Sequence, residues 1–244
     1  DPQGQIVRSM LEGAGVDTSM LAIDPNWPTS TTVLPIRPNG DRPNWHMMGA
    51  SIFAPVTEAE FAALDRTRNV HWAAVGFPGT MGKGADFLRE AQAGGVFTSC
   101  DLIAPTEAAQ SDLDTLLPHV DLFMPSLAEM RELAGTDDPV EGAHRFMARG
   151  AKGCLVKLGG EGALLVLSDE QIHAPAHRID PVGDSLCAGY IAGRTRGLDQ
   201  AGALRFAVAT AARVAMGVGT LGLLEDYDTT LAFMLDTAVK DERR

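Results

Sequence analysis

Residues 180–193 read DPVGDSLCAGYIAG, in which a polar turn leads into a run rich in alanine and glycine. Such a run predicts a helix that packs closely against a sheet, because its side chains are small. Gly183 and Asp184 would stand at the start of this helix, where unpaired backbone N–H groups and the helix dipole attract an anion. A carboxylate at this position is equally a good N-cap. The residues alone therefore leave an anion site and a plain helix cap both open.

From residue 70 onward, apolar strands alternate with helices along the chain. We expect strands at residues 70–75, 97–102, 121–124, 153–157 and 163–166. We expect helices at residues 84–93, 111–117, 126–134, 139–149, 185–196, 199–217 and 229–239. Apolar strands between helices are typical of a parallel sheet that is covered on both faces. The sequence therefore predicts an α/β fold, with residues 1–244 in a single domain.

The first fifty residues are patterned differently. Residues 4–16 predict an amphipathic helix, and residues 29–37 predict a β-strand. The Asn-Gly pair at 39–40 is a strong hairpin signal, and we expect residues 45–53 to form the returning strand. Residues from about 28 to 53 would then form a small β lid on the α/β body.

Composition excludes several classes of function. The net charge of −12 argues against non-specific binding to nucleic acid or to an anionic membrane, and 6% aromatic residues disfavour a base-stacking surface. No apolar run approaches the roughly 18 residues of a membrane span, and no secretory signal is visible. The three cysteines show no metal-binding or disulfide spacing, which is typical of reduced thiols in a cytoplasmic protein. There is no P-loop, no G-x-S-x-G elbow and no zinc-type histidine pair.

Residues 180–189 resemble the second signature of the PfkB, or ribokinase, family of carbohydrate kinases, D-T-x-G-A-G-D-x-F-x-A-G. Asp180 matches the first Asp of that signature, and Asp184 matches the last. The resemblance implies a ribokinase-like three-layer α/β/α sandwich with a mostly parallel central sheet and a small β lid. It also implies phosphoryl transfer from ATP to a hydroxyl of a sugar or sugar-like molecule, with Asp184 as the catalytic base and Gly183 in the anion hole.

The sequence departs from the family pattern in two places. One glycine, Gly183, stands between Val182 and Asp184 where the family has Gly-Ala-Gly. The first residues, DPQGQI, resemble the family's G-x-D-x-x-G stretch, so we expect the N-terminal strand region with its sugar-binding Gly-Gly motif to be missing from this sequence. If the short turn is genuine, a catalytically inactive sugar- or nucleotide-binding homologue is the alternative, because the oxyanion donors would be misplaced.

Residues 121–129, DLFMPSLAE, resemble the family's D-x-x-x-P-N-x-x-E. The resemblance implies that Glu129 organises Mg²⁺ through water, and that Ser126 takes the place of an Asn that contacts the nucleotide. Mg²⁺ keeps several of its waters in proteins, so a carboxylate acting through water is reasonable. From the residues alone, Glu129 is simply a first-turn residue that the helix dipole stabilises.

Residues 156–163, VKLGGEGA, read as a strand, a turn and a second strand, and resemble the family's L-G-x-x-G turn. The resemblance implies that Gly159 and Gly162 bring the backbone against ATP, and that Lys157 adds positive charge near the phosphates. Glycines allow a backbone to approach a phosphate or ribose closely. Taken alone, the segment predicts a glycine hairpin.

Residues 206–220, FAVATAARVAMGVGT, align with the helix and loop that border the adenine pocket in the family. This similarity implies nucleotide contacts at Val208 and Gly219. It also implies a monovalent-cation site, suited to K⁺, formed by Asp180, the carbonyl of Val182 and backbone carbonyls of the loop at residues 217–220.

The substrate is the least determined part of the prediction. Asp101 lies near the end of the expected strand 97–102, which resembles the family's strand ending in L-D. Ligands bind at the carboxyl ends of strands in open α/β sheets, although capping of the next loop by Asp101 is an equal interpretation. Trp45 and His46 on the lid are candidates for substrate contact, or for packing within the lid or a dimer. We expect a sugar substrate, with a nucleoside, as in an adenosine kinase relative, as the alternative. The resemblance also implies a homodimer that forms through the β lid.

Overall fold

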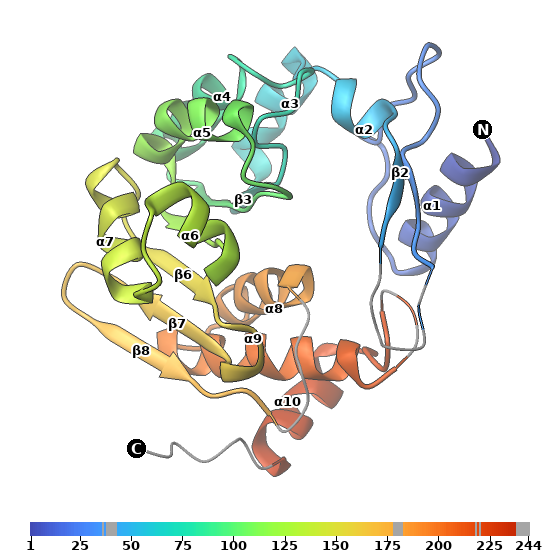
Figure 1. Cartoon of the computed structure of the whole chain (residues 1–244). Helices are drawn as coiled ribbons and strands as arrows, with labels where there is room; N and C mark the ends of the chain where they lie inside the picture. Colours follow the sequence, from blue (N-terminus) through green and yellow to red (C-terminus); the bar gives the residue numbers. More distant parts are fainter. Residues whose placement is uncertain (36, 38–42, 178–182, 218, 220, 238–244) are drawn as a thin grey trace.

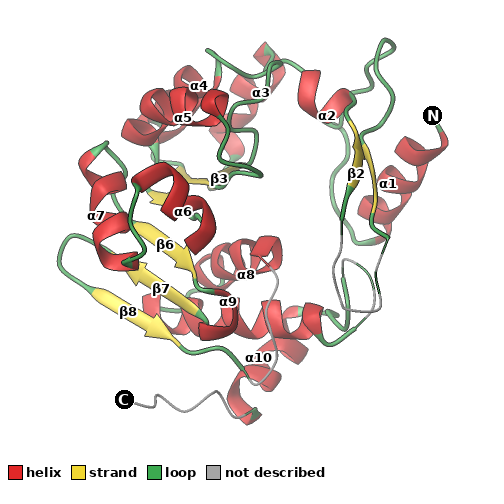
Figure 2. Ribbon diagram, in the orientation of Figure 1, coloured by secondary structure: helices red, strands yellow, loops and turns green. Residues whose placement is uncertain are grey.

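The computed structural model describes residues 1–35, 37, 43–177, 183–217, 219 and 221–237. At its centre is a six-stranded sheet with the order β3-β4-β5-β6-β7-β8 (Figure 2). The strands are β3 (Asn69–Trp72), β4 (Phe97–Cys100), β5 (Leu122–Phe123), β6 (Cys154–Lys157), β7 (Ala163–Val166) and β8 (Gln171–Ala174). Strands β3 to β6 run parallel, whereas β7 pairs antiparallel with both β6 and β8. The expected mostly parallel sheet is confirmed, and it ends in an antiparallel edge.

Helices cover both faces of this sheet (Figure 1). One face carries α4 (Gly84–Ala93), α5 (Glu107–Leu116), α6 (Leu127–Ala134) and α7 (Pro139–Ala148). The other face carries α8 (Gly183–Thr195) and α9 (Gln200–Ala215), and α10 (Tyr227–Asp236) packs on α9. Short 3₁₀ turns lie at Leu64–Arg66, Leu117–His119 and Gly159–Glu161. The three-layer α/β/α architecture expected from the sequence is therefore confirmed.

The alternation of side chains along the central strands builds two cores. In β5, Phe123 faces the first helix layer and meets Phe146 of α7 edge to face, with 4.9 Å between ring centroids. Its neighbours Leu122 and Met124 face the other layer, where they join Leu155 and the helices α8 and α9. All of these side chains are buried. A continuous apolar strand is therefore required here, because both of its faces are covered.

The lid contains two short antiparallel strands, β1 (Thr31–Val33) and β2 (Trp45–Met47). The lid and the preceding helix α1 (Pro2–Gly13) stand apart from the central sheet in Figure 1. No residue of α1 is buried, although its apolar side chains fall on one face as expected. The strands are shorter than predicted, and the Asn-Gly turn at 39–40 lies outside the described residues.

One sequence expectation was wrong in this region, and two elements, one here and one beside β7, were missed. The expected strand at 45–53 ends at Met47, and residues 50–53 form the short helix α2 (Ala50–Phe53). Helix α3 (Glu58–Ala63), which opens with a capping box at Thr57, was not predicted. Strand β8 was also missed, because its exposed Gln171 and His173 interrupt the apolar pattern.

Candidate active site

The carboxyl ends of the parallel strands bring several predicted site residues to one edge of the sheet. Asp101 follows the last residue of β4, and Lys157 is the last residue of β6. Between them, β5 leads through Pro125 into Ser126, the N-cap of α6. The backbone N–H of Lys157 donates to the Pro125 carbonyl at 2.9 Å, so this loop is tied to β6. Ligands bind at such edges in open α/β sheets.

A buried ion pair lies at this edge. The ammonium of Lys157 stands 2.8 and 2.7 Å from the two carboxylate oxygens of Asp101, and both side chains are at most 10% exposed. Asp101 also accepts hydrogen bonds from the backbone N–H of Leu102 at 2.8 Å and from the thiol of Cys187, on α8, at 3.3 Å. Burial lowers the pKa of Lys157, but the Asp101 charge and hydrogen bond, together with Cys187 and Glu129, outweigh burial, so the pKa of Lys157 is raised overall.

The two residues of this ion pair were predicted from the sequence to contact two different ligands. Asp101 was predicted to contact the substrate, and Lys157 was predicted to lie near the phosphates. In the structure their charged groups face each other inside the protein. Two of the three N–H donors of the Lys157 ammonium are thus directed at Asp101, which the sequence pattern gave no reason to expect.

Ser126 and Glu129 form a reciprocal cap at the start of α6. The N–H of Glu129 donates to Ser126 Oγ at 3.2 Å, and the N–H of Ser126 donates to Glu129 Oε2 at 2.7 Å. Among the described residues, no three His, Cys, Asp or Glu side chains are grouped to hold a metal ion. Glu129 is half-buried, and its predicted role toward Mg²⁺ stays a prediction.

The glycine turn after β6 contains two glycines with different surroundings. Gly159 has a φ of +57°, and a Cβ placed on it would meet no atom within 4 Å. Gly162 has a φ of +97°, and its Cβ would lie only 2.0 Å from the carbonyl oxygen of Ala174. Gly162 is thus required for packing against the end of β8. Gly159 leaves an open surface, which fits the backbone approach expected for a nucleotide.

Gly219 and Val208, the other two predicted nucleotide residues, also differ. Gly219 has a φ of +84° with open space beside it, like Gly159. Val208 lies on α9 with an exposed fraction of 1%, inside the second core. Its side chain therefore packs within the protein, and any contact at an open nucleotide surface must come from neighbouring residues.

Helix α8 begins at Gly183, so Gly183 and Asp184 stand in its first turn as predicted. The contact of Cys187 with Asp101 fixes the place of this turn at the carboxyl ends of β4 and β6. The proposed cation ligands Asp180 and Val182 lie outside the described residues, so that site stays a prediction.

A cavity of about 720 Å³ lies between the ends of β3 and β4 and one side of α8. Asp101 lines it, together with His71 from β3 and Ala188 from α8. The Nδ1 atom of His71 lies 2.9 Å from Ser99 Oγ on the neighbouring strand. His71 was not predicted to lie at this edge, because a lone histidine within a strand carries no motif.

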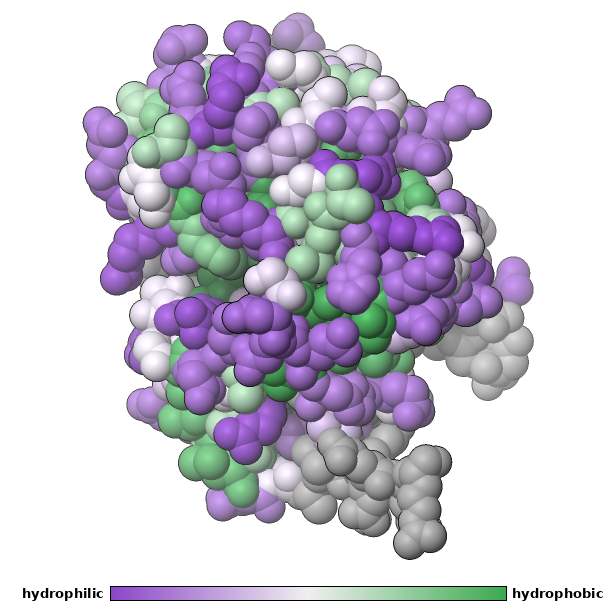
Figure 3. Space-filling model, turned by 90° about the vertical axis from the view of Figure 1, so that its left-hand side faces the viewer, coloured by the Kyte–Doolittle hydropathy of each residue, from purple (hydrophilic) through white to green (hydrophobic). Residues whose placement is uncertain are grey.

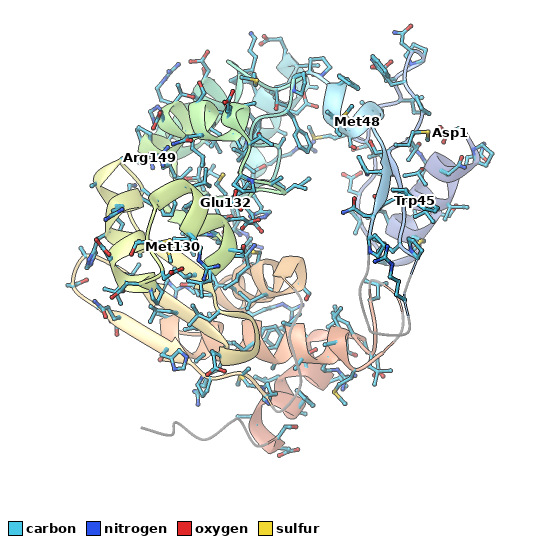
Figure 4. All side chains as sticks on the ribbon, viewed as in Figure 1. Asp1, Trp45, Met48, Met130, Glu132 and Arg149 are labelled. Carbon is cyan, nitrogen blue, oxygen red and sulfur yellow. The ribbon has the colours of Figure 1, made fainter. Side chains whose placement is uncertain are left out.

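The lid residues predicted to touch the substrate lie on β2. Trp45 is 70% exposed, and His46 Nδ1 lies 2.8 Å from Oγ1 of its cross-strand partner Thr32. Figure 4 shows Trp45 and Met48 on the lid, whereas Met130 belongs to α6 in the body. The structure therefore places Trp45 and His46 on an element separate from Asp101 and the strand ends.

The model of the pfkB family of carbohydrate kinases matches residues 1–226. This chain belongs to that family. It is 31% identical over 243 residues to 1-phosphofructokinase of Haloferax volcanii, covering 97% of this chain and 78% of the relative. It is 20% identical to aminoimidazole riboside kinase of Salmonella typhimurium over 78% of this chain and 64% of that protein. The family is therefore the one that the sequence motifs indicated, and these relatives are sugar and riboside kinases.

The fold of this pfkB family member is also found in solved structures. A putative ribokinase II from E. coli, in complex with ATP and Mg²⁺, matches with a TM-score of 0.79 and 22% identity, over 96% of this chain and 80% of that one. This likeness confirms the ribokinase-like fold. In the part of the kinase that the structure describes, no helix is long and apolar enough to cross a membrane. The face shown in Figure 3 is mainly hydrophilic, with smaller hydrophobic areas between.

Proposed function

We propose that this chain transfers a phosphoryl group from ATP to a hydroxyl of a sugar or sugar-like small molecule, with Asp184 as the catalytic base. The observation that carries the proposal is the position of α8, whose first turn holds Gly183 and Asp184 and is joined through Cys187 to the carboxyl edge of the sheet. Family membership supports the reaction class. The relative bound to ATP and Mg²⁺ supports the phosphoryl donor and the metal.

Each proposed group has a role that its position supports. Asp184 accepts the proton of the attacking hydroxyl, which general-base catalysis requires. The N–H of Gly183 and the start of α8 stabilise the negative charge on the transferring group. Glu129 would hold the waters of Mg²⁺, and the metal would supply neutralisation of the charge on the phosphates. The open backbone at Gly159 and Gly219 lies against the nucleotide.

The test is Asp184→Asn, assayed by ATP consumption against a panel of sugars, sugar phosphates and nucleosides. We expect turnover to fall at least about 100-fold, because loss of a general base removes that much rate. The matched control is Asp199→Asn, which alters the side chain that caps α9 by accepting from Gly202 N–H at 2.6 Å. Equal, small losses in the two variants would reduce Asp184 to a helix cap and refute the proposal.

The same panel decides between two alternatives. Selective turnover of a nucleoside would favour a riboside kinase, the activity named for the Salmonella relative. Binding of ATP or sugar without turnover of any compound would favour an inactive homologue, as the single Gly before Asp184 suggests. The first outcome changes the substrate in the proposal, and the second refutes the catalytic part.

The lid supports a further part of the proposal, a homodimer. Several apolar side chains of the lid are exposed to solvent, with exposed fractions of 70% for Trp45, 54% for Val33 and 50% for Met47. Grouped apolar side chains of this kind mark interaction sites. We expect sedimentation at twice the 25.8 kDa chain mass, and the single chain mass for Trp45→Asp. Leu235→Asp, at a 69% exposed position of α10, should leave the dimer intact; a monomeric unaltered protein would refute the dimer.

A further inference from the structure

The ion pair of Asp101 and Lys157 connects elements that are far apart in the sequence. Asp101 follows β4 and Lys157 ends β6, so the pair spans the end of β5, which lies between those strands. The two residues are separated by 56 positions, and Asp101 and Cys187 by 86. The pair therefore joins two strands of the sheet to the first half of α8.

Stability alone is a poor explanation of such a pair. Removing two charged groups from water costs free energy that their attraction often fails to return, and apolar residues of similar size are frequently as stable or more stable in the same place. Both carboxylate oxygens of Asp101 and the ammonium of Lys157 are nevertheless buried here. A role that depends on geometry accounts for the pair better than a role in stability.

Two segments of the proposed site depend on this geometry. The backbone of Lys157 bonds to Pro125, directly before the Ser126 and Glu129 cap that is proposed to hold the waters of Mg²⁺. The carboxylate of Asp101 accepts from Cys187, three positions after Asp184 in the same helix. Catalysis is sensitive to such placement, since a displacement of about 1 Å can cost roughly 100-fold in rate.

We propose that the buried Asp101–Lys157 pair is a positioning device, which sets the first turn of α8 and the start of α6 at a fixed separation across the end of β5. This inference rests on the proposed role of Asp184. Neither member of the pair exchanges a proton or touches the phosphates. Lys157 is thereby reassigned from a phosphate contact to a positioning residue, and Asp101 from a substrate contact to its partner.

The experiment compares Lys157→Met, Asp101→Asn and the double variant by turnover, by KM for ATP and by thermal midpoint. Each single variant leaves one buried charge without its partner, so its thermal midpoint falls. The double variant removes both charges, and its midpoint recovers. We expect kcat of the double variant to stay about 100-fold below the unaltered protein, with KM for ATP changed less than about threefold.

A second ion pair of the same sheet serves as the control. Lys152 Nζ lies 2.7 Å from Asp121 Oδ1, at the opposite edge of the sheet where β5 and β6 begin. Replacement of both, as Lys152→Met with Asp121→Asn, should leave kcat within about twofold, because neither α8 nor the cap of α6 bonds to this pair. A large fall in kcat for this control would mean that any ion pair at the sheet edges matters, and would overturn the inference.

A second variant covers the case in which the double variant fails to fold. Cys187→Ala removes the hydrogen bond from α8 to Asp101 and leaves the ion pair in place. We expect kcat to fall several-fold, with a fall in the thermal midpoint that is small compared with that of the single charge variants. If kcat recovers together with the thermal midpoint in the double variant, the pair has a purely structural role and the inference is overturned. Unaltered kcat in Cys187→Ala would overturn it in the same way. An unaltered protein that turns over no substrate would instead refute the proposed function itself.

Discussion

The two glycines of the turn after β6 allow one prediction to be worked out in detail. In Gly162→Ala the new Cβ would lie 2.0 Å from Ala174 O and 2.6 Å from Ala176 N, at a φ of +97°. Backbone strain at such a φ costs roughly 1–3 kcal/mol, and overpacking typically adds about 1–3 kcal/mol. We therefore expect a loss of about 4 kcal/mol in the free energy of unfolding, which corresponds to a thermal midpoint lower by roughly 10 °C.

Gly159→Ala is the matched comparison, because it lies in the same turn. Its φ of +57° carries a cost of about 1–2 kcal/mol for alanine, but its Cβ meets no atom within 4 Å. The thermal midpoint should therefore fall by only about 4 °C. Its open surface is proposed to face the nucleotide, so KM for ATP should rise in Gly159→Ala. Gly162→Ala should leave KM for ATP close to that of the unaltered protein.

Circular dichroism during heating and an ATP-dependent turnover assay measure these two effects. A stability loss that is equal in the two variants would refute the packing explanation of Gly162. A KM for ATP that is unchanged in Gly159→Ala would refute the proposal that the nucleotide lies against the open turn.

Two other predictions concern the stability of the body. Burial alone would raise the pKa of Asp121, but the hydrogen bonds from Lys152 and Thr98 and the Lys152 charge outweigh burial and lower this pKa. The ionised Asp121 therefore stabilises the fold above the ordinary Asp pKa, and this stabilisation is lost as the pH falls through the lower pKa of the folded state. The free energy of urea unfolding should therefore fall less steeply between about pH 5 and pH 3 in Asp121→Asn than in the unaltered protein. An equal pH dependence of the unfolding free energy in the two proteins would contradict this. Phe123→Ala removes a fully buried ring that packs on Phe146, and should cost about 3–5 kcal/mol in urea unfolding. Leu235→Ala, at an exposed position, should change the free energy of unfolding by less than about 0.5 kcal/mol. A similar loss of stability in Phe123→Ala and Leu235→Ala would contradict the assigned core.

Strong local patterns in the sequence were sufficient for much of the fold. Helix α4 and strand β7 were predicted with the bounds that the structure has, because their apolar periods are clear. The stretch after Met47 was not, since a short apolar run such as Gly49–Phe53 fits either a strand or a helix. Strand β8 was missed because half of its side chains face solvent.

The site was predictable where a motif places residues in one local element. The start of α8 near Gly183 and the cap made by Ser126 and Glu129 follow from adjacent residues. The pairing of Asp101 with Lys157 was not predictable, because it depends on two strands separated by 56 positions and on a helix further along the chain. The motif placed Lys157 at the end of a strand, where the structure has it, but it carried no information on the direction of the side chain.

The burial of the three cysteines has a practical consequence for experiments on this protein. Cys100 and Cys154 are fully buried and Cys187 is 1% exposed, and burial raises the pKa of the Cys100 and Cys154 thiols. The thiolate is the form that alkylating reagents attack, so the folded chain should react slowly. Alkylation then proceeds through transient opening of the core, and its rate measures the free energy of that opening. The protein therefore carries its own reporters of conformational fluctuation, one beside the ion pair and two in the sheet, without any introduced label.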